Sequence, residues 1–294
     1  MLAVLLLAAS ASADESAPLV RCVERSDRAC VAALLSHAPG SPSPEFLAAA
    51  ARGYILLGDR THAVQAIVEA VAQRPHDFEL LMSQGWVYQR SGDQVSAIRS
   101  FLLASQVDST APSVFYELGM SFFLLHEFDR AATHFRHAID LHMKDGRADF
   151  MLGVLAVLQD ALPDAKEHFE RALAREPQNA HYLLHYGVLL SRLNDNDAAL
   201  AQMRKAEQLD PANPLTHFNL GRLYRELGQL DDARHELQEA IRLRPDFSSA
   251  HYVLAGVYRR QGRPRDTATE LAQFKKFKPK DDDGDPIDAS LTQQ

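Results

Sequence analysis

The sequence has little of what metal-binding, disulfide-rich or catalytic domains depend on. Only two of its 294 residues are cysteine and one is tryptophan, which excludes a cysteine-rich scaffold or a multi-cysteine zinc site. The chain has no Gly-x-Ser-x-Gly motif, P-loop, dinucleotide fingerprint or nucleophilic Cys/His arrangement. We therefore expect no enzyme activity and no cofactor.

An excess of basic residues is also absent. Lys and Arg number 31 against 39 Asp and Glu, for a formal net charge of -8. A nucleic-acid surface needs a concentrated basic footprint, so we expect no nucleic-acid partner. Part of the acidic excess lies near the C-terminus, where five aspartates cluster: Asp281, Asp282, Asp283, Asp285 and Asp288. We expect residues 282–294 to form a disordered acidic tail.

No apolar run approaches the roughly 20 residues that a membrane-spanning helix needs. The N-terminal run covers residues 2–9, and Ala11-Ser12-Ala13 follows it just before Asp14. This order is typical of the apolar region and cleavage site of a secretory signal, although no Lys or Arg precedes the run. We predict a signal peptide at residues 1–13 and an exported, periplasmic or secreted protein. The alternative is an unprocessed apolar start on a cytoplasmic protein.

Both cysteines, Cys22 and Cys30, follow the predicted cleavage point closely. In an exported chain this pair predicts a disulfide that holds a short helical turn against the first repeat. The alternative is two small buried apolar residues. We expect residues 14–43 to form an N-terminal helical cap, with a helix at residues 28–37 that ends at Pro39-Gly40.

The sequence repeats itself at an offset of 34 residues. One series consists of small residues: Ala51, Gly85, Gly119, Gly153, Gly187, Gly221 and Ala255. A second series consists of alanines: Ala63, Ala97, Ala131, Ala165, Ala199 and Ala233. Four residues after the second series stand large apolar residues: Ile67, Phe101, Phe135, Phe169, Met203, Leu237 and Leu271. Five of the seven repeats close with a proline: Pro75, Pro177, Pro211, Pro245 and Pro279.

The spacing within each repeat predicts two antiparallel helices that cross closely. Apolar residues three and four apart put one stripe of each helix against its partner. Small residues are needed where the two backbones approach. Turn-forming pairs such as Gly58-Asp59 and Asn194-Asp195 lie between the two stripes. One helix pair cannot bury its own stripe, so neighbouring pairs must stack into an all-α solenoid.

These positions resemble the tetratricopeptide repeat family, with its small, aromatic, alanine and proline positions. The resemblance covers seven repeats with the following bounds: 44–77, 78–111, 112–145, 146–179, 180–213, 214–247 and 248–281. It implies a right-handed superhelical α-solenoid of helix-turn-helix repeats. It also implies a scaffold that holds a peptide segment or a partner subunit, here of a cell-envelope complex.

In this family the first helix of each repeat lines the concave face, mainly through its second, fifth, ninth and twelfth positions. Carrying these positions over gives the candidate partner-binding residues: Met82, Trp86, Tyr116, Met120, Phe123, Phe150, Phe218, Arg222, Arg225, Tyr252 and Arg259. The resemblance thus implies a groove with an apolar, aromatic middle and arginines at its C-terminal end, suited to a peptide carrying a carboxylate. The alternative is that several of these residues pack against the next repeat.

Family members that clamp the tail of a chaperone use lysine and asparagine at the fifth and ninth positions. Met82 and Trp86 stand there in the second repeat. The resemblance therefore does not extend to that clamp.

Thirteen histidines leave a second class of function open, a metal-dependent binder or enzyme. His181 and His185 are four apart, which places both imidazoles on one face of a helix. A catalytic zinc site needs a third ligand, and the sequence offers none nearby, so we expect no metal. The last helix carries Phe274 and Phe277, and we expect an exposed aromatic there to permit self-association.

Overall fold

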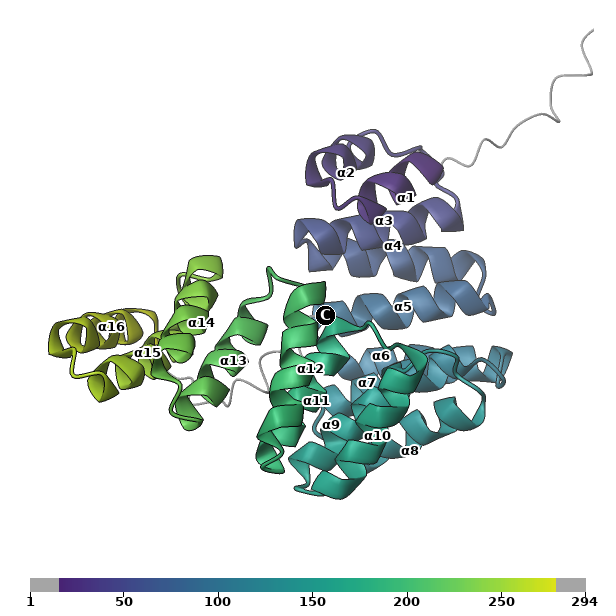
Figure 1. The fold of residues 1–294 in the computed structure, drawn as a ribbon. Helices are drawn as coiled ribbons and strands as arrows, with labels where there is room; N and C mark the ends of the chain where they lie inside the picture. The colour runs from purple at the N-terminus through teal and green to yellow at the C-terminus, as the bar shows by residue number, and fades with distance from the viewer. Residues whose placement is uncertain (1–15, 279–294) are drawn as a thin grey trace, which may run out of the picture. The chain divides into compact units, whose positions relative to one another are not determined.

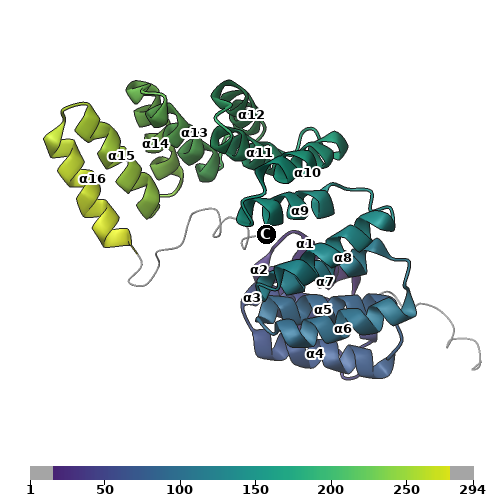
Figure 2. The ribbon, with the colours of Figure 1, turned by 90° about the horizontal axis from the view of Figure 1, so that it is seen from below.

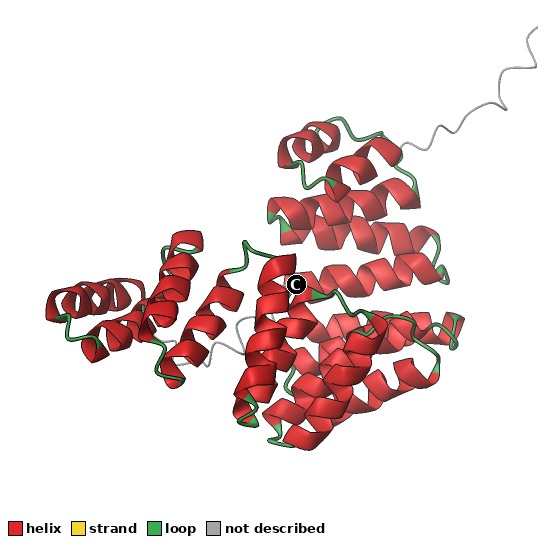
Figure 3. Ribbon diagram, viewed as in Figure 1, coloured by secondary structure: helices red, strands yellow, loops and turns green. Residues whose placement is uncertain are grey.

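The computed structural model describes residues 16–278 of the chain. The predicted signal peptide at residues 1–13 and the predicted acidic tail at residues 282–294 lie outside the described residues. Within them the fold is entirely α-helical, with sixteen helices joined by short loops and no strand (Figures 1 and 3). None of these described helices has the length and apolarity that crossing a membrane requires.

Two short helices come first, and fourteen longer ones follow. In chain order the helices are α1 (Ala17–Glu24), α2 (Arg28–Leu35), α3 (Pro44–Leu57), α4 (Arg60–Gln73), α5 (Phe78–Ser91), α6 (Gln94–Val107), α7 (Pro112–Leu124), α8 (Phe128–Asp140), α9 (Arg147–Leu158), α10 (Leu162–Arg175), α11 (Ala180–Arg192), α12 (Asn196–Leu209), α13 (Pro214–Glu226), α14 (Leu230–Leu243), α15 (Ser248–Arg260) and α16 (Pro264–Phe277).

From α3 onward the helices pack as consecutive pairs, and each repeat contributes a first and a second helix. The two helices of a pair lie side by side, as Figure 2 shows for α5 with α6 and for α15 with α16. The chain divides into two compact units, an N-terminal unit (residues 1–143) and a C-terminal unit (residues 144–294). The sequence repeat does not predict this division. It falls where Met143 replaces the proline that closes most repeats.

The close crossing that the small residues predict is confirmed. A Cβ atom built on Gly119 would lie 2.6 Å from the ring of Phe135, and one on Gly153 would lie 2.7 Å from the ring of Phe169. Both rings are almost completely buried. The large apolar residue of the second helix therefore fills the space that the glycine of the first helix leaves open.

The loop between the two helices of each repeat has one residue with a positive φ angle. This residue recurs every 34 positions: Gly58, Gly92, His126, Asp160, Asn194, Gly228 and Gly262. A left-handed residue ends the first helix and turns the chain back. In several repeats an aspartate follows and caps the second helix, as when Asp195 accepts a hydrogen bond from the Ala198 N–H.

The N-terminal unit begins with a cap made of α1 and α2, which pack against α3. Leu19 and Val31 of the cap belong to the apolar core of this unit. A disulfide joins Cys22 of α1 to Cys30 of α2, with a Cα–Cα distance of 5.8 Å. Arg28 donates hydrogen bonds of 2.5 and 3.0 Å to the last two carbonyl groups of α3. These contacts fasten the cap to the first repeat.

Candidate functional site

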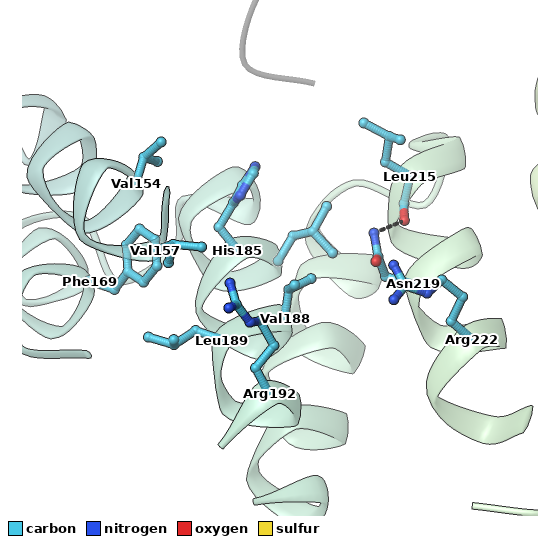
Figure 4. Close-up of a pocket in the computed structure, with 11 residues that line it drawn as sticks. Val154, Val157, Phe169, His185, Val188, Leu189, Arg192, Leu215, Asn219 and Arg222 are labelled. Atoms are coloured by element: carbon cyan, nitrogen blue, oxygen red, sulfur yellow. Dashed lines mark hydrogen bonds between the residues drawn. The ribbon is translucent and has the colours of Figure 1, made fainter. Parts of the chain in front are cut away.

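The C-terminal unit contains an apolar pocket between the first helices of three successive repeats (Figure 4). Val154 and Val157 come from α9, Val188 from α11 and Leu215 from α13. The remaining lining residues are Phe169, Leu184, His185, Leu189, Arg192, Asn219 and Arg222. Its volume is about 40 Å³. Since one water occupies roughly 10–15 Å³ on this measure, the pocket has room for about three non-hydrogen atoms, the size of an aliphatic side chain.

A more polar cleft of about 440 Å³ adjoins this pocket between α11 and α13. Four residues line both the pocket and the cleft: Val188, Arg192, Asn219 and Arg222. Ser191 and Glu226 line the cleft alone. Its volume is in the range of roughly 300–1,000 Å³ that is usual for ligand sites. The pocket is thus a small apolar cavity, and the adjoining cleft is its wider, more polar opening.

Two arginines make one side of this opening cationic. Arg192 pairs with Asp160 at 2.9 Å, and the side chain of Asp160 is 81 % exposed, so water screens this pair. The Arg222 guanidinium lies 5.8 Å from the centre of the Phe218 ring. Because neither arginine is held by a buried acid, both can bind a carboxylate by charge-assisted hydrogen bonds.

His185 places a polar atom on the otherwise apolar wall. Its Nε2 is buried and has no hydrogen-bond partner within the described chain. Burial, together with the neighbouring His181, lowers the pKa of His185 to about 3, so the ring is neutral at physiological pH. Asn219 donates a 2.8 Å hydrogen bond to the Leu215 carbonyl and presents its own amide oxygen at the pocket (Figure 4). The pocket therefore offers a few polar atoms as well as apolar surface.

The predicted binding residues of the C-terminal unit divide into two groups. Arg222 lines the pocket, Arg225 is half-buried, and Tyr252 and Arg259 are exposed. Phe150 and Phe218, in contrast, are only 4 % and 2 % exposed. The Phe150 ring is stacked on Tyr182 at 4.6 Å, so it packs between helices and presents no surface to a partner. Contact of these two phenylalanines with a partner stays a prediction, which their burial does not support.

In the N-terminal unit the predicted residues are mostly packed. Phe123 is 5 % exposed and lies 5.8 Å from the ring of Phe128, so it too is a packing residue. The other four are half-buried: Met82, Trp86, Tyr116 and Met120. Trp86 packs against the core of this unit, and Tyr116 lies 5.7 Å from the Phe135 ring. Their contact with a partner stays a prediction.

Arg222 is the one lining residue that was among the predicted binding residues, and the three other polar lining residues were missed. His185 and Asn219 occupy the sixth position of their repeats, and Arg192 occupies the thirteenth. The sixth position lies one residue from the fifth and so borders the same face of the helix. A comparison of the sixth position across the seven repeats could have identified both residues. An imidazole or amide side chain stands there only in two repeats, as His185 and Asn219, and these two repeats are adjacent.

Among the described residues, no third candidate metal ligand lies with His181 and His185. Their rings are 4.4 Å apart, and burial lowers both pKa values, that of His181 to about 4. Within residues 16–278 the one group of three candidate ligand atoms is instead Glu207, His217 and Glu236. The guanidinium of Arg204 already pairs with both of these glutamates, at 2.7 and 2.8 Å. This cluster is therefore a network of ion pairs.

The end of the chain's last helix does not carry a fully exposed aromatic residue. Phe274 lies 5.1 Å from the ring of Tyr252, and Phe277 is stacked on His251 at 5.8 Å. Both phenylalanines are half-buried. Tyr252 itself is 57 % exposed. Self-association through this helix stays a prediction.

Comparison with known families identifies the repeat. Two family models, both described as tetratricopeptide repeat, match residues 159–214 and 190–257. A search of curated protein sequences finds no match to this chain. The matched residues include α10 to α14, and so cover the pocket and the cleft except for the part formed by α9.

Solved structures with the same fold include three named examples. The Cut9–Hcn1 hetero-tetramer of APC/C has a TM-score of 0.67 at 20 % identity over 95 % of this chain and 54 % of that chain, so this chain spans about half its length. PilW, described as a widely conserved type IV pilus biogenesis factor, has a TM-score of 0.63 at 18 % identity, over 73 % of this chain and 98 % of that one. YrrB, described as a TPR protein with an unusual peptide-binding site, has a TM-score of 0.50 at 22 % identity, over 63 % and 95 %.

The stacked helix pairs, their glycine crossings and their 34-residue period define an all-α solenoid of helical hairpins. With the matches above, residues 159–257 are tetratricopeptide repeats, and the described chain has the fold of the solved structures.

Proposed function

We propose that this protein is an interaction scaffold that binds an extended peptide segment between α11 and α13. The observation that carries the proposal is the apolar pocket with two arginines at its opening. An aliphatic side chain of the partner enters the pocket, and a carboxylate close to it in sequence binds Arg192 and Arg222. The description of YrrB gives a precedent for peptide binding on this fold.

This arrangement predicts what the bound peptide looks like. A pocket of about 40 Å³ accepts Val, Leu or Ile more readily than an aromatic ring. The adjoining cleft places the arginines beside the pocket, so the acidic group belongs within about three residues of the aliphatic one, given a rise of roughly 3.3 Å per extended residue. A free C-terminal carboxylate satisfies the same requirement.

Selection from a random peptide library displayed on phage tests the proposal directly. We expect the selected peptides to share an aliphatic residue followed by Asp, Glu or the chain end. Arg222→Gln should weaken their binding about tenfold or more, since hydrogen bonds to charged groups contribute roughly 1.5–3 kcal/mol. Val188→Asp should weaken it similarly by placing a charge in the pocket.

Arg242→Gln is the matched control, because Arg242 is an exposed arginine of α14 that pairs with Glu239 outside the pocket. It should leave the binding constant unchanged. Selected peptides that bind equally well to the Arg222→Gln and Val188→Asp variants would place the binding surface elsewhere.

We also propose that the scaffold acts outside the cytoplasm, in the cell envelope or as a secreted protein. The signal-like segment at residues 1–13 supports this, as does the pairing of Cys22 with Cys30, since disulfides persist in oxidising compartments. Expression of the full chain in a Gram-negative host, with fractionation and N-terminal sequencing, tests it. A product that starts at Asp14 in the periplasm or medium is expected. An intact N-terminus in the cytosol would contradict export.

A further inference from the structure

Both ring nitrogens of His217 on α13 face hydrogen-bond acceptors. Nδ1 lies 2.8 Å from Oε2 of Glu236 on α14, and Nε2 lies 3.1 Å from the carbonyl oxygen of Pro211. The histidine is 5 % exposed and the glutamate 1 %. A carboxylate and a carbonyl can only accept, and a neutral imidazole has only one N–H. The protonated ring alone satisfies both contacts.

The next repeat contains the same arrangement, shifted by 34 residues. Nδ1 of His251 on α15 lies 2.6 Å from Oε2 of Glu270 on α16, and Nε2 lies 3.0 Å from the carbonyl oxygen of Pro245. His251 is also 5 % exposed. In both repeats the histidine thus links its own helix to the second helix and to the loop before it.

The charged groups around His217 form a closed network. Glu207 of α12 lies 3.7 Å from Nδ1, and Arg204 of α12 bonds both Glu207 and Glu236. Arg204 also donates to the hydroxyl oxygen of Tyr224 at 2.8 Å. Glu239 of α14 adds a further negative charge near the ring. The imidazolium and one guanidinium therefore balance the two buried or half-buried glutamates.

The surroundings of His251 are simpler. At the positions equivalent to Glu207 and Arg204 stand Ile241 and Gln238. Gln238 donates to the Tyr258 hydroxyl oxygen at 3.0 Å, as Arg204 does to Tyr224. Phe277 of α16 stacks on the histidine ring. Glu270 is therefore the acidic group that faces this ring.

Other repeats show what the chain uses when no histidine is present. In the repeat just before, the equivalent residues are Leu183 and Gln202, and Leu183 is 2 % exposed. The fold thus accepts an uncharged pair at this position. A Leu and Gln pair is therefore a suitable replacement for His and Glu in a control variant.

We propose that protonated His217 fastens the helix pair α13–α14, so that this pair is more stable in mildly acidic than in alkaline solution. When the ring loses a proton, one of its two hydrogen bonds is lost, and the buried glutamate loses a cationic partner. This inference concerns stability and holds whether or not a peptide binds between α11 and α13.

The pKa values agree with this direction. The hydrogen bond with Glu236 raises the pKa of His217 above its ordinary value of 6.5, against the effect of burial. Its stabilisation is therefore complete below pH 6.5 and is lost as pH rises through the higher pKa of the folded state. Burial alone would raise the pKa of Glu236, but its bonds with His217 and the charge of Arg204 lower it below 4.5. That contribution is lost only as pH falls below this range.

Hydrogen exchange measured by mass spectrometry on the full chain, between pH 5.5 and 8.5, tests the proposal. Protection factors, corrected for the intrinsic effect of pH, should fall over this range in α13–α14. Protection of α11–α12, with its Leu183–Gln202 pair, should change much less. The double variant His217→Leu with Glu236→Gln should flatten the response of α13–α14.

The equivalent double variant of the next repeat, His251→Leu with Glu270→Gln, is the matched control and should leave the pH response of α13–α14 in place. If either double variant fails to fold, His217→Gln or His251→Gln replaces it, because glutamine is neutral throughout this range. Proton NMR titration of the imidazole signals, assigned with these variants, gives an independent reading. Equal pH responses in α11–α12 and α13–α14, or a His217 signal that titrates below 6.5, would overturn the proposal.

Discussion

Gly85 of α5 lies so close to Phe101 of α6 that a Cβ atom on the glycine would sit 2.3 Å from the phenylalanine ring. Phe101 is completely buried. The pair fixes the distance between the two helices of the second repeat, and the same pairing recurs at the offset of 34. The contact between the smallest and one of the largest residues is what sets the geometry of the hairpin.

Gly85→Ala should therefore destabilise the protein by roughly 1–3 kcal/mol, the usual cost of overpacking a core. The ring of Phe101 cannot move away without displacing its buried neighbours. Denaturant unfolding followed by circular dichroism measures the change. Gly40→Ala is the control, since a Cβ there meets nothing within 4 Å. A loss no larger in Gly85→Ala than in this control would show that the helices separate easily.

Removal of the disulfide should loosen the cap and little else. Cys22 and Cys30 are eight residues apart, so the closed loop is short. A bond across such a loop contributes about 2 kcal/mol in the chain-entropy model. Cys22→Ser with Cys30→Ser should raise hydrogen exchange in α1 and α2 while α5 to α8 keep their protection. Uniformly increased exchange throughout the N-terminal unit would mean that the cap nucleates the whole unit.

Asp149 of α9 is completely buried, and its charge depends on Arg175 of α10, whose Nη1 lies 3.2 Å from Oδ2. Arg175→Ala should cost about 2 kcal/mol or more, because the buried carboxylate then loses its nearer basic partner and keeps only His168, whose Nδ1 lies 3.9 Å from Oδ1. Arg171→Ala on the same helix removes an exposed pair with Glu167 and should cost less than about 1 kcal/mol. Thermal unfolding of both variants gives the comparison. Similar losses in the two would show that Asp149 relies on another partner.

At the left-handed turn residues, replacement by glycine and replacement of glycine should have opposite effects on the stability of the protein. His126 has a φ of 58° and Gly58, its equivalent, has 87°. Since the left-handed conformation costs a non-glycine residue roughly 1–2 kcal/mol, His126→Gly should stabilise the protein and Gly58→Ala should destabilise it. A Cβ atom on Gly58 would meet nothing within 4 Å, and His126 is exposed with one ring contact, to Phe128 at 5.8 Å, so little packing changes. Melting temperatures that move in the same direction would contradict this account.

The repeat spacing was sufficient to predict the helices and their crossings, because a small residue and a large residue on paired helices have to meet. Position within the repeat predicted a binding role for both Arg222 and Phe150, whereas Arg222 lines the pocket and Phe150 is buried. Both stand at positions that line the concave face in the family. The neighbours decide the difference: Phe150 is enclosed by Tyr182 and His181 of the next repeat, which no pattern within one repeat shows.

The histidine–glutamate links were likewise beyond the repeat pattern. His217 and Glu236 are 19 residues apart and belong to different helices. The sequence shows that they recur as His251 and Glu270, but only the structure shows that the rings also reach the carbonyl groups of Pro211 and Pro245. The repeat therefore shows that the two histidine–glutamate pairs are equivalent. The hydrogen bonds that each histidine makes are known only from the structure.

The constant length of the repeats makes the protein divisible in whole modules. Asn179 caps α11 and Asn213 caps α13 in the same way, each through its side-chain oxygen. A chain spliced from Asn179 directly to Pro214 would restore an Asn-Pro junction like the native one and omit α11 and α12 alone. Such a shortened molecule keeps the repeat architecture and lacks the proposed peptide site, so one deletion separates folding from binding.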